Sequence, residues 1–208
     1  MRRRTALALG LLLGLTSTNA AADDFAAGSL IIPMDTDYQD LGMLEAYGLV
    51  YELLKKGVPV RWVIKVGKQN GGVDFMATST DVRTGDPLEP HGYRGGPWVI
   101  DSADAAEAMP IIEAWQTANQ NTAVHEASAP FSGDVSRTLV VAPSIAMMAD
   151  GNQKIARKYM LAAKIPDSIG DPNWPDASPD MLDPDEISGP TMDNHHDGAL
   201  FDEDGDPV

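Results

Sequence analysis

Three aspartates lie close together in the segment DTDYQD, residues 35–40. Carboxylate oxygens are the ligands that Mg²⁺ and Ca²⁺ prefer in proteins. Asp35, Asp37 and Asp40 follow a short apolar run, so the pattern indicates a divalent-metal site at the end of a buried strand. The same residues also suit the start of a helix, where one carboxylate would cap the first turn and the others would face solvent. The sequence leaves both interpretations open.

A second group of candidate residues surrounds the apolar run at residues 98–100. Arg94 precedes this run and could clamp a ligand carboxylate, and Asp101 follows it. In an open parallel sheet, ligands bind beyond the carboxyl ends of the strands. Alternatively, the glycines at 95–96 serve a tight turn and Arg94 pairs with a nearby acid. The predicted ligand-binding residues are Asp35, Asp37, Arg94 and Asp101.

The last residues of the chain contain another acidic pattern. Asp202, Asp204 and Asp206 resemble a fragment of a calcium-binding loop, although the distal Glu of such loops is missing. A segment rich in Asp and Gly also produces such matches by chance. These three residues are therefore a second candidate site for Ca²⁺.

Residue types that are isolated or missing exclude several kinds of catalytic and binding site. Cysteine is absent, which excludes disulfides, thiolate metal ligands and a thiol nucleophile. His91 and His125 lack a Ser or an acid at the spacing of a catalytic triad, so we expect them to be loop or packing residues. Without a thiol nucleophile or a triad, the sequence leans toward a protein that is not an enzyme.

The net charge of −16 argues against nucleic acid as a partner, because such binding needs a basic surface.

The chain of 208 residues divides into three parts. Residues 1–22 combine three arginines, a short apolar run and an Ala-x-Ala pattern, which is typical of a secretory signal peptide. Residues 23–165 have the apolar content of one folded domain. Residues 166–208 contain thirteen acids, seven prolines and no Lys or Arg, which predicts an irregular acidic arm or tail. No run in the mature chain is long enough to cross a membrane, and we expect a secreted, periplasmic or cell-surface protein.

The central part alternates between predicted strands and helices. Apolar runs at 29–34 and 58–65 flank a stretch at 41–56 with helical periodicity, which is the signature of a βαβ unit. Residues 66–93 lack a strong periodicity, and we expect a long excursion with one short hairpin at most. The other predicted elements are strands at 98–100, 122–127 and 138–142 and helices at 102–119 and 152–164.

This alternation predicts the α/β class, with three layers and a mainly parallel sheet flanked by helices. In such a domain the apolar faces of the helices and both faces of the sheet are buried. The residues expected in the core are Leu44, Val50, Leu54, Val60, Val63, Val99, Ile111 and Val140.

A family resemblance extends over most of the mature chain. Three segments carry it: IIPMDTDYQDLGMLEAYGLVYELLKKGVPVRWVIKVGK (31–68), YRGGPWVIDSADAA (93–106) and GALFDEDGDPV (198–208). Together they resemble a group of uncharacterised exported bacterial proteins. The resemblance implies an α/β domain of the class I glutamine amidotransferase-like, or flavodoxin-like, kind. It does not imply that activity, because amidotransferases use a Cys nucleophile and this chain has none.

Three functions are compatible with these observations. The first is an exported, non-catalytic α/β domain that binds a partner or a cell-surface component, since no nucleophile is recognisable. The second is a metal-assisted periplasmic hydrolase or transferase that uses the loop of Asp35, Asp37 and Asp40. The third is a calcium-dependent surface protein that acts through the C-terminal tail. The last two would require Ca²⁺ or Mg²⁺.

Overall fold

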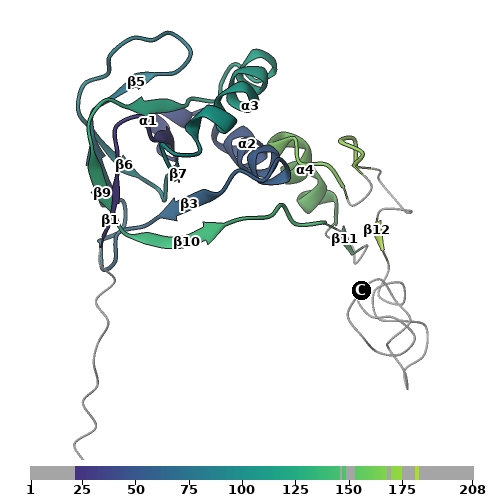
Figure 1. Ribbon diagram of the computed structural model, residues 1–208. Helices are drawn as coiled ribbons and strands as arrows, with labels where there is room; N and C mark the ends of the chain where they lie inside the picture. Colours follow the sequence, from purple (N-terminus) through teal and green to yellow (C-terminus); the bar gives the residue numbers. More distant parts are fainter. Residues whose placement is uncertain (1–21, 146, 149–152, 168–169, 175–180, 183–208) are drawn as a thin grey trace, which may run out of the picture.

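A computed structural model gives the structure of residues 22–145, 147–148, 153–167, 170–174 and 181–182 (Figure 1). The predicted signal peptide, apart from its last residue, lies outside this described part. So does most of the predicted acidic arm, including Asp202, Asp204 and Asp206. None of the helices in the described part is long and apolar enough to cross a membrane.

The centre of the molecule is a six-stranded sheet with the order β10-β3-β7-β2-β8-β5 (Figure 1). Its strands are β2 (Leu30–Ile32), β3 (Val60–Val63), β5 (Ser79–Asp81), β7 (Trp98–Ile100), β8 (His125–Ala127) and β10 (Val135–Leu139). Each strand runs antiparallel to its neighbours. The prediction of a mainly parallel sheet is therefore wrong, and the fold is mixed α/β with mainly antiparallel sheets.

The reason for this error is a strand inserted between the two halves of the predicted βαβ unit. Strands β2 and β3 do run in the same direction and are joined by α2 (Met43–Lys55), but β7 lies between them. In the same way, α3 (Ala105–Ala118) joins β7 to β8 across β2. Two such split units give the βαββαβ arrangement known from ferredoxin-like proteins. Hydrophobic periodicity predicts the strands and helices of these two units but does not show which strand is inserted between two others.

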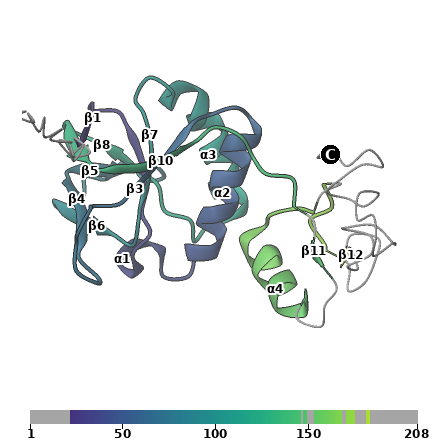
Figure 2. The ribbon, with the colours of Figure 1, turned by 90° about the horizontal axis from the view of Figure 1, so that it is seen from below.

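Helices α2 and α3 cover one face of this sheet (Figure 2). Leu30 and Ile32 point to this face because they are two residues apart on β2, and they pack with Leu49 and Leu53 of α2. Pro110 lies inside α3, where the sequence predicts a kink or a restart, and the helix continues through it.

Two small sheets cover the other face, where the sequence predicts helices. They are β1 (Asp23–Phe25) with β9 (Phe131–Gly133), and β4 (Val73–Ala77) with β6 (His91–Arg94). In this layer the ring of Phe131 stacks on those of Phe25 and Phe75, with centroid distances of 5.0 and 4.7 Å. The segment 66–93, expected to be an excursion, thus supplies the strands β4, β5 and β6. The three layers are helices, main sheet and small sheets.

The remaining elements lie at the edges of this domain. The short α1 (Thr36–Gln39) follows β2, and α4 (Gln153–Ala163) packs against α2. Strands β11 (Met147–Met148) and β12 (Met181–Leu182) form a small parallel pair. Among the described residues, β10 is an edge strand, and its register with β3 is interrupted by an irregularity between Val135 and Arg137.

Most of the predicted core residues are buried, and two are not. Val50, Leu54, Val60, Val63 and Val99 are buried, as expected, and Ile111 is partly buried. Leu44 is 36% exposed because the buried face of α2 runs through the neighbouring positions Ala46, Leu49 and Leu53. Val140 is 63% exposed because β10 ends one residue before it. Both predictions were wrong by a small shift along an element.

Candidate functional site

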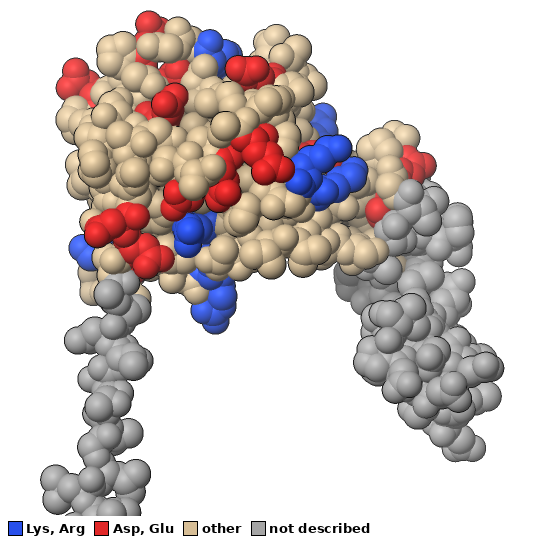
Figure 3. Space-filling model, in the orientation of Figure 1, with Lys and Arg blue, Asp and Glu red and all other residues tan. Residues whose placement is uncertain are grey.

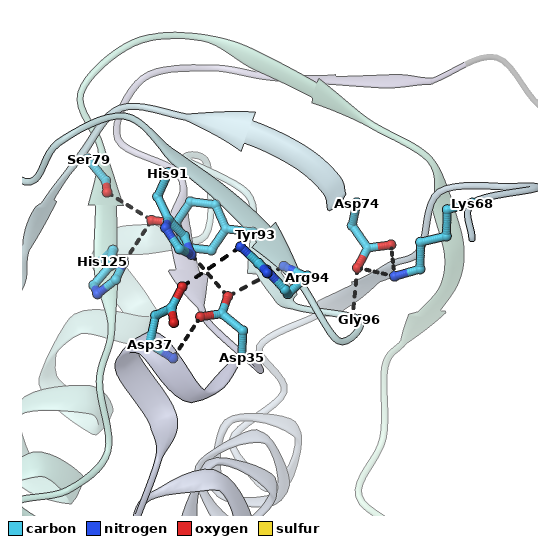
Figure 4. Close-up of polar contacts among 10 residues, drawn as sticks. All are labelled: Asp35, Asp37, Lys68, Asp74, Ser79, His91, Tyr93, Arg94, Gly96 and His125. Atoms are coloured by element: carbon cyan, nitrogen blue, oxygen red, sulfur yellow. Dashed lines mark hydrogen bonds and ion pairs between the residues drawn. The ribbon is translucent and has the colours of Figure 1, made fainter. Parts of the chain in front are cut away.

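Asp35 lies at the centre of a polar cluster at the end of β2 (Figure 4). Its Oδ1 accepts a hydrogen bond of 3.2 Å from the backbone N–H of Asp37 and so caps α1. Its Oδ2 lies 3.1 Å from Nε2 of His91 and 3.4 Å from the backbone nitrogen of Arg94. The Asp35 residue is only 5% exposed. Three donors therefore hold a buried carboxylate in a fixed position.

The Asp35 carboxylate, the Asp37 carboxylate and the His91 imidazole form a group that we call the metal group. One ligand-type atom from each lies within 4.8 Å of the other two. Asp37 is on the exposed side of α1, and His91 comes from β6, 56 positions after Asp35. Asp40, the third predicted metal ligand, ends α1 and is not in this group. The structure thus brings two of the three predicted ligands close together and places a histidine beside them.

Arg94 also lies at this cluster, as the prediction of a ligand site requires. Its guanidinium is 3.8 Å from Oδ2 of Asp37. Gly95 and Gly96 follow with φ angles of 80° and 75°, which favour glycine. A Cβ on Gly95 would also collide with the backbone oxygen of Met34. The tight turn and the ion pair considered as alternatives are therefore present, and they are what brings Arg94 to the acids.

Asp101 lies at the opposite end of the sheet. Because β2 and β7 are antiparallel, Leu30 pairs with Ile100, and Asp101 is next to the start of β2 rather than its end. The side chain of Asp101 forms an ion pair of 3.5 Å with Arg61. The structure therefore does not bring Asp101 together with Asp35. The rule for parallel sheets that suggested this grouping does not apply here.

A pocket of ≈ 410 Å³ adjoins the metal group. Its lining includes Met34, Asp35, Met43, Lys68 and Arg94. The ammonium group of Lys68 lies 2.5 and 2.6 Å from the two carboxylate oxygens of Asp74, and that carboxylate is completely buried (Figure 4). Asp74 also accepts hydrogen bonds from the backbone nitrogens of residues 65 and 96. Lys68 is thus held in place by a fully hydrogen-bonded partner.

A second polar cluster, which we call the buried network, joins strands β5 and β8 of the main sheet to β6 of a small sheet. The Tyr93 hydroxyl is 2.8 Å from Oγ of Ser79 and 2.7 Å from Nδ1 of His125. All three residues are buried. Burial raises the pKa of Tyr93 to about 12 and lowers the pKa of His125 to about 4, so both side chains are neutral at pH 7. Nε2 of His125 is buried without a hydrogen-bond partner among the described residues.

Tyr38 lies between His91 of the metal group and His125 of the buried network, and the rings of His91 and Tyr93 also meet edge to face, with centroids 4.9 Å apart. The ring of Tyr38 is perpendicular to the rings of His91 and His125, with centroid distances of 4.8 and 4.4 Å. The next residue, Gln39, forms two hydrogen bonds with the backbone of Ala123, of 2.9 and 3.1 Å. These contacts fasten α1 to the segment that leads into β8. Burial raises the pKa of Tyr38, and the carboxylates of Asp35, Asp37 and Asp81 add to this effect.

Sequence reasoning did not connect the two histidines with the site. His91 and Tyr93 are two residues apart on β6, so they face the same side of the strand. That alternation was a usable signal, but residues 66–93 were expected to contain a hairpin at most. His125 carries no such signal, because its partners Ser79 and Tyr93 come from strands far away in the sequence.

Charged side chains of both signs lie interspersed on the face drawn in Figure 3. On that face no continuous basic stripe of the kind that binds nucleic acid is visible among the described residues. The exclusion of nucleic acid stays a prediction.

Searches among protein-family models, curated proteins and solved structures found no significant match to the chain. The resemblance to exported bacterial proteins therefore stays a prediction. The flavodoxin-like fold that it implies is wrong, because each strand of the main sheet runs antiparallel to its neighbours. The site has to be interpreted from its own geometry.

Proposed function

We propose that the protein is an exported binding domain that holds a divalent metal ion between Asp35, Asp37 and His91. The observation that carries this proposal is the convergence of two carboxylates and one imidazole, from two distant segments, to within 4.8 Å. Carboxylate and imidazole are common metal ligands in proteins. The export follows from the predicted signal peptide and is part of the proposal.

The separation of two ligand atoms supports a single shared ion. Zn²⁺ binds His nitrogen and Asp oxygen at about 2.1 Å, so atoms 3.1 Å apart would subtend an angle of about 95° at the metal. A small side-chain rotation would bring the exposed carboxylate of Asp37 to the same ion. His91 would then bind through Nε2 instead of donating a hydrogen bond from it.

The imidazole also changes the metal that the site favours. Ca²⁺ takes six to eight oxygen ligands, whereas a mixed nitrogen and oxygen set suits first-row transition ions. With His91 in place of Asp40, we propose Zn²⁺ rather than Ca²⁺ or Mg²⁺ as the preferred ion. Three protein ligands would leave at least one coordination position open.

A metal-assisted hydrolase or transferase is the second candidate function. The specific observation that favours it is the ≈ 410 Å³ pocket beside the metal group, into which an open coordination position could face. A metal-bound water is a nucleophile at neutral pH when the metal lowers its pKa. The binding function is preferred because the buried network of Ser79, Tyr93 and His125 is closed to solvent and offers no accessible general base.

Calorimetric titration with Zn²⁺ and with Ca²⁺ tests the proposal. We expect Zn²⁺ to bind more tightly than Ca²⁺, and His91→Gln and Asp37→Asn each to weaken Zn²⁺ binding by tenfold or more. Both side chains are partly or fully exposed, so these variants should fold, which circular dichroism can verify.

Asp40→Asn is the matched control, since it removes an exposed acid from the same loop. It should bind Zn²⁺ like the unaltered protein. Equal affinity in all four proteins would place the metal elsewhere and reject the proposed site.

A further inference from the structure

The pocket beside the metal group has a mixed character. Met34 and Met43 provide an apolar wall, while Lys68 and Arg94 bring positive charge to its lining. A ligand that fills it should therefore have an aliphatic part and an anionic end.

The two basic side chains of the pocket differ in availability. Lys68 is held by the buried carboxylate of Asp74, which neutralises it. Arg94 is paired with Asp37 at 3.8 Å, and both of these side chains are about half exposed. The guanidinium of Arg94 can therefore leave Asp37 without leaving either charge buried and unpaired.

The charge of the metal group decides when an anion can bind. Asp35 and Asp37 against Arg94 leave one excess negative charge at the mouth of the pocket, which repels an anion. A divalent ion would reverse this to one excess positive charge. It would also compete with Arg94 for Asp37 and so release the guanidinium toward the pocket.

We propose that this pocket binds a small aliphatic carboxylate, clamped by Arg94, and that it does so with useful affinity when the metal site is filled. This inference rests on the proposed metal function and names its ligand class. A carboxylate suits the two parallel N–H donors of a guanidinium, and its carbon chain suits the two methionines. Metal and carboxylate are then coupled, each raising the affinity of the other by the same factor.

The experiment uses the mature chain, Zn²⁺ and butyrate. Zn²⁺ is titrated by calorimetry with and without saturating butyrate, and butyrate is titrated with and without Zn²⁺. We expect butyrate to raise the Zn²⁺ affinity roughly fivefold or more, which is the lower end of couplings between two ligands. Acetate, which lacks the longer carbon chain, should raise it less.

Arg94→Gln separates a clamp from a structural role. Without butyrate, this variant should bind Zn²⁺ at least as tightly as the unaltered protein, because a competitor for Asp37 is gone. Butyrate should then no longer raise the affinity. Arg61→Gln is the matched control, since Arg61 forms a similar ion pair with Asp101 at the other end of the sheet. It should keep the full butyrate effect.

The outcomes distinguish this inference from the proposed function. Normal Zn²⁺ binding that butyrate does not change would overturn the inference and leave the metal function standing. Absence of Zn²⁺ binding would overturn both. An equal gain with acetate, or a gain with phosphate in place of butyrate, would overturn the assignment to aliphatic carboxylates.

Discussion

The metal group and the buried network lie on either side of Tyr38, yet they have opposite physical character. The metal group is charged and partly open to solvent, and it adjoins a pocket. The buried network is neutral at pH 7 and closed, and its hydroxyl and imidazole groups hydrogen-bond one another. The comparison indicates that similar residue types can contribute to stability in one cluster and, as we propose, to binding in the other. Exposure and the sign of the local charge decide between these roles.

The largest effect is expected from acid, which should destabilise the protein through His125 of the buried network. Because burial lowers the pKa of His125 from 6.5 to about 4, the unfolded state takes up a proton between these values before the folded state does. The stability that neutral His125 contributes is complete above pH 6.5 and is lost as the pH falls toward 4. By linkage, the loss amounts to about 3 kcal/mol at pH 4.

Urea denaturation of the unaltered protein and of His125→Gln at pH 7, 5 and 4 measures this effect. The variant keeps a side-chain acceptor for Tyr93 but cannot titrate, so its stability should fall less across the range. Parallel pH profiles of the two proteins would show that His125 is not buried as described.

Removing the central hydroxyl of the buried network should have the next largest effect. Tyr93→Phe leaves Ser79 and His125 without their partner, and an unsatisfied buried polar group costs about 1–3 kcal/mol. Chemical denaturation gives the change in unfolding free energy. Tyr47→Phe, which removes an exposed hydroxyl, should stay within about 0.5 kcal/mol. A similar cost in both variants would mean that the network contributes nothing specific.

In contrast to Tyr93→Phe, His91→Gln should reduce metal binding much more than stability. Glutamine keeps a side-chain N–H that can donate to the buried carboxylate of Asp35 in place of His91, so we expect a loss of stability of about 1 kcal/mol or less. The same change removes a proposed metal ligand, so thermal melting with Zn²⁺ should no longer show the upward shift that ligand binding gives. A loss of stability larger than that of Tyr93→Phe would contradict the division into a binding cluster and a structural one.

The smallest effect is expected at Asp40. Its side chain is exposed and outside the metal group, so Asp40→Asn should change neither the unfolding free energy by more than about 0.5 kcal/mol nor the Zn²⁺ affinity. A clear loss of metal binding would restore the three-aspartate loop as the ligand set.

The sequence predicted the elements of the fold better than their arrangement. The strand at 98–100 was placed to the residue, and both helices that cover the sheet were placed within a few residues. Periodicity records which face of an element is buried but does not show what buries it. The layer of small sheets was therefore missed, and with it His91, Tyr93 and Asp74.

For the candidate site too, the sequence predicted local groups of residues better than the contacts between distant segments. Asp35 and Asp37 are only two residues apart in the sequence, so their local pattern was visible. Arg94 was also chosen, and the turn at Gly95 and Gly96 brings it to them. Asp101 was chosen through a rule for parallel sheets, and antiparallel pairing places it at the other end. The contribution of His91 depends on a strand pairing that no short motif records.

The irregular register of β10 also bears on how far the main sheet can extend. Among the described residues, this strand exposes one row of backbone groups to solvent, which is a template for strands of other molecules. The bulge between Val135 and Arg137 twists that row, and the charge of Arg137 opposes the approach of a flat apolar strand. Natural sheets use both features against aggregation, so the β10 edge of the main sheet disfavours edge-to-edge stacking at high protein concentration.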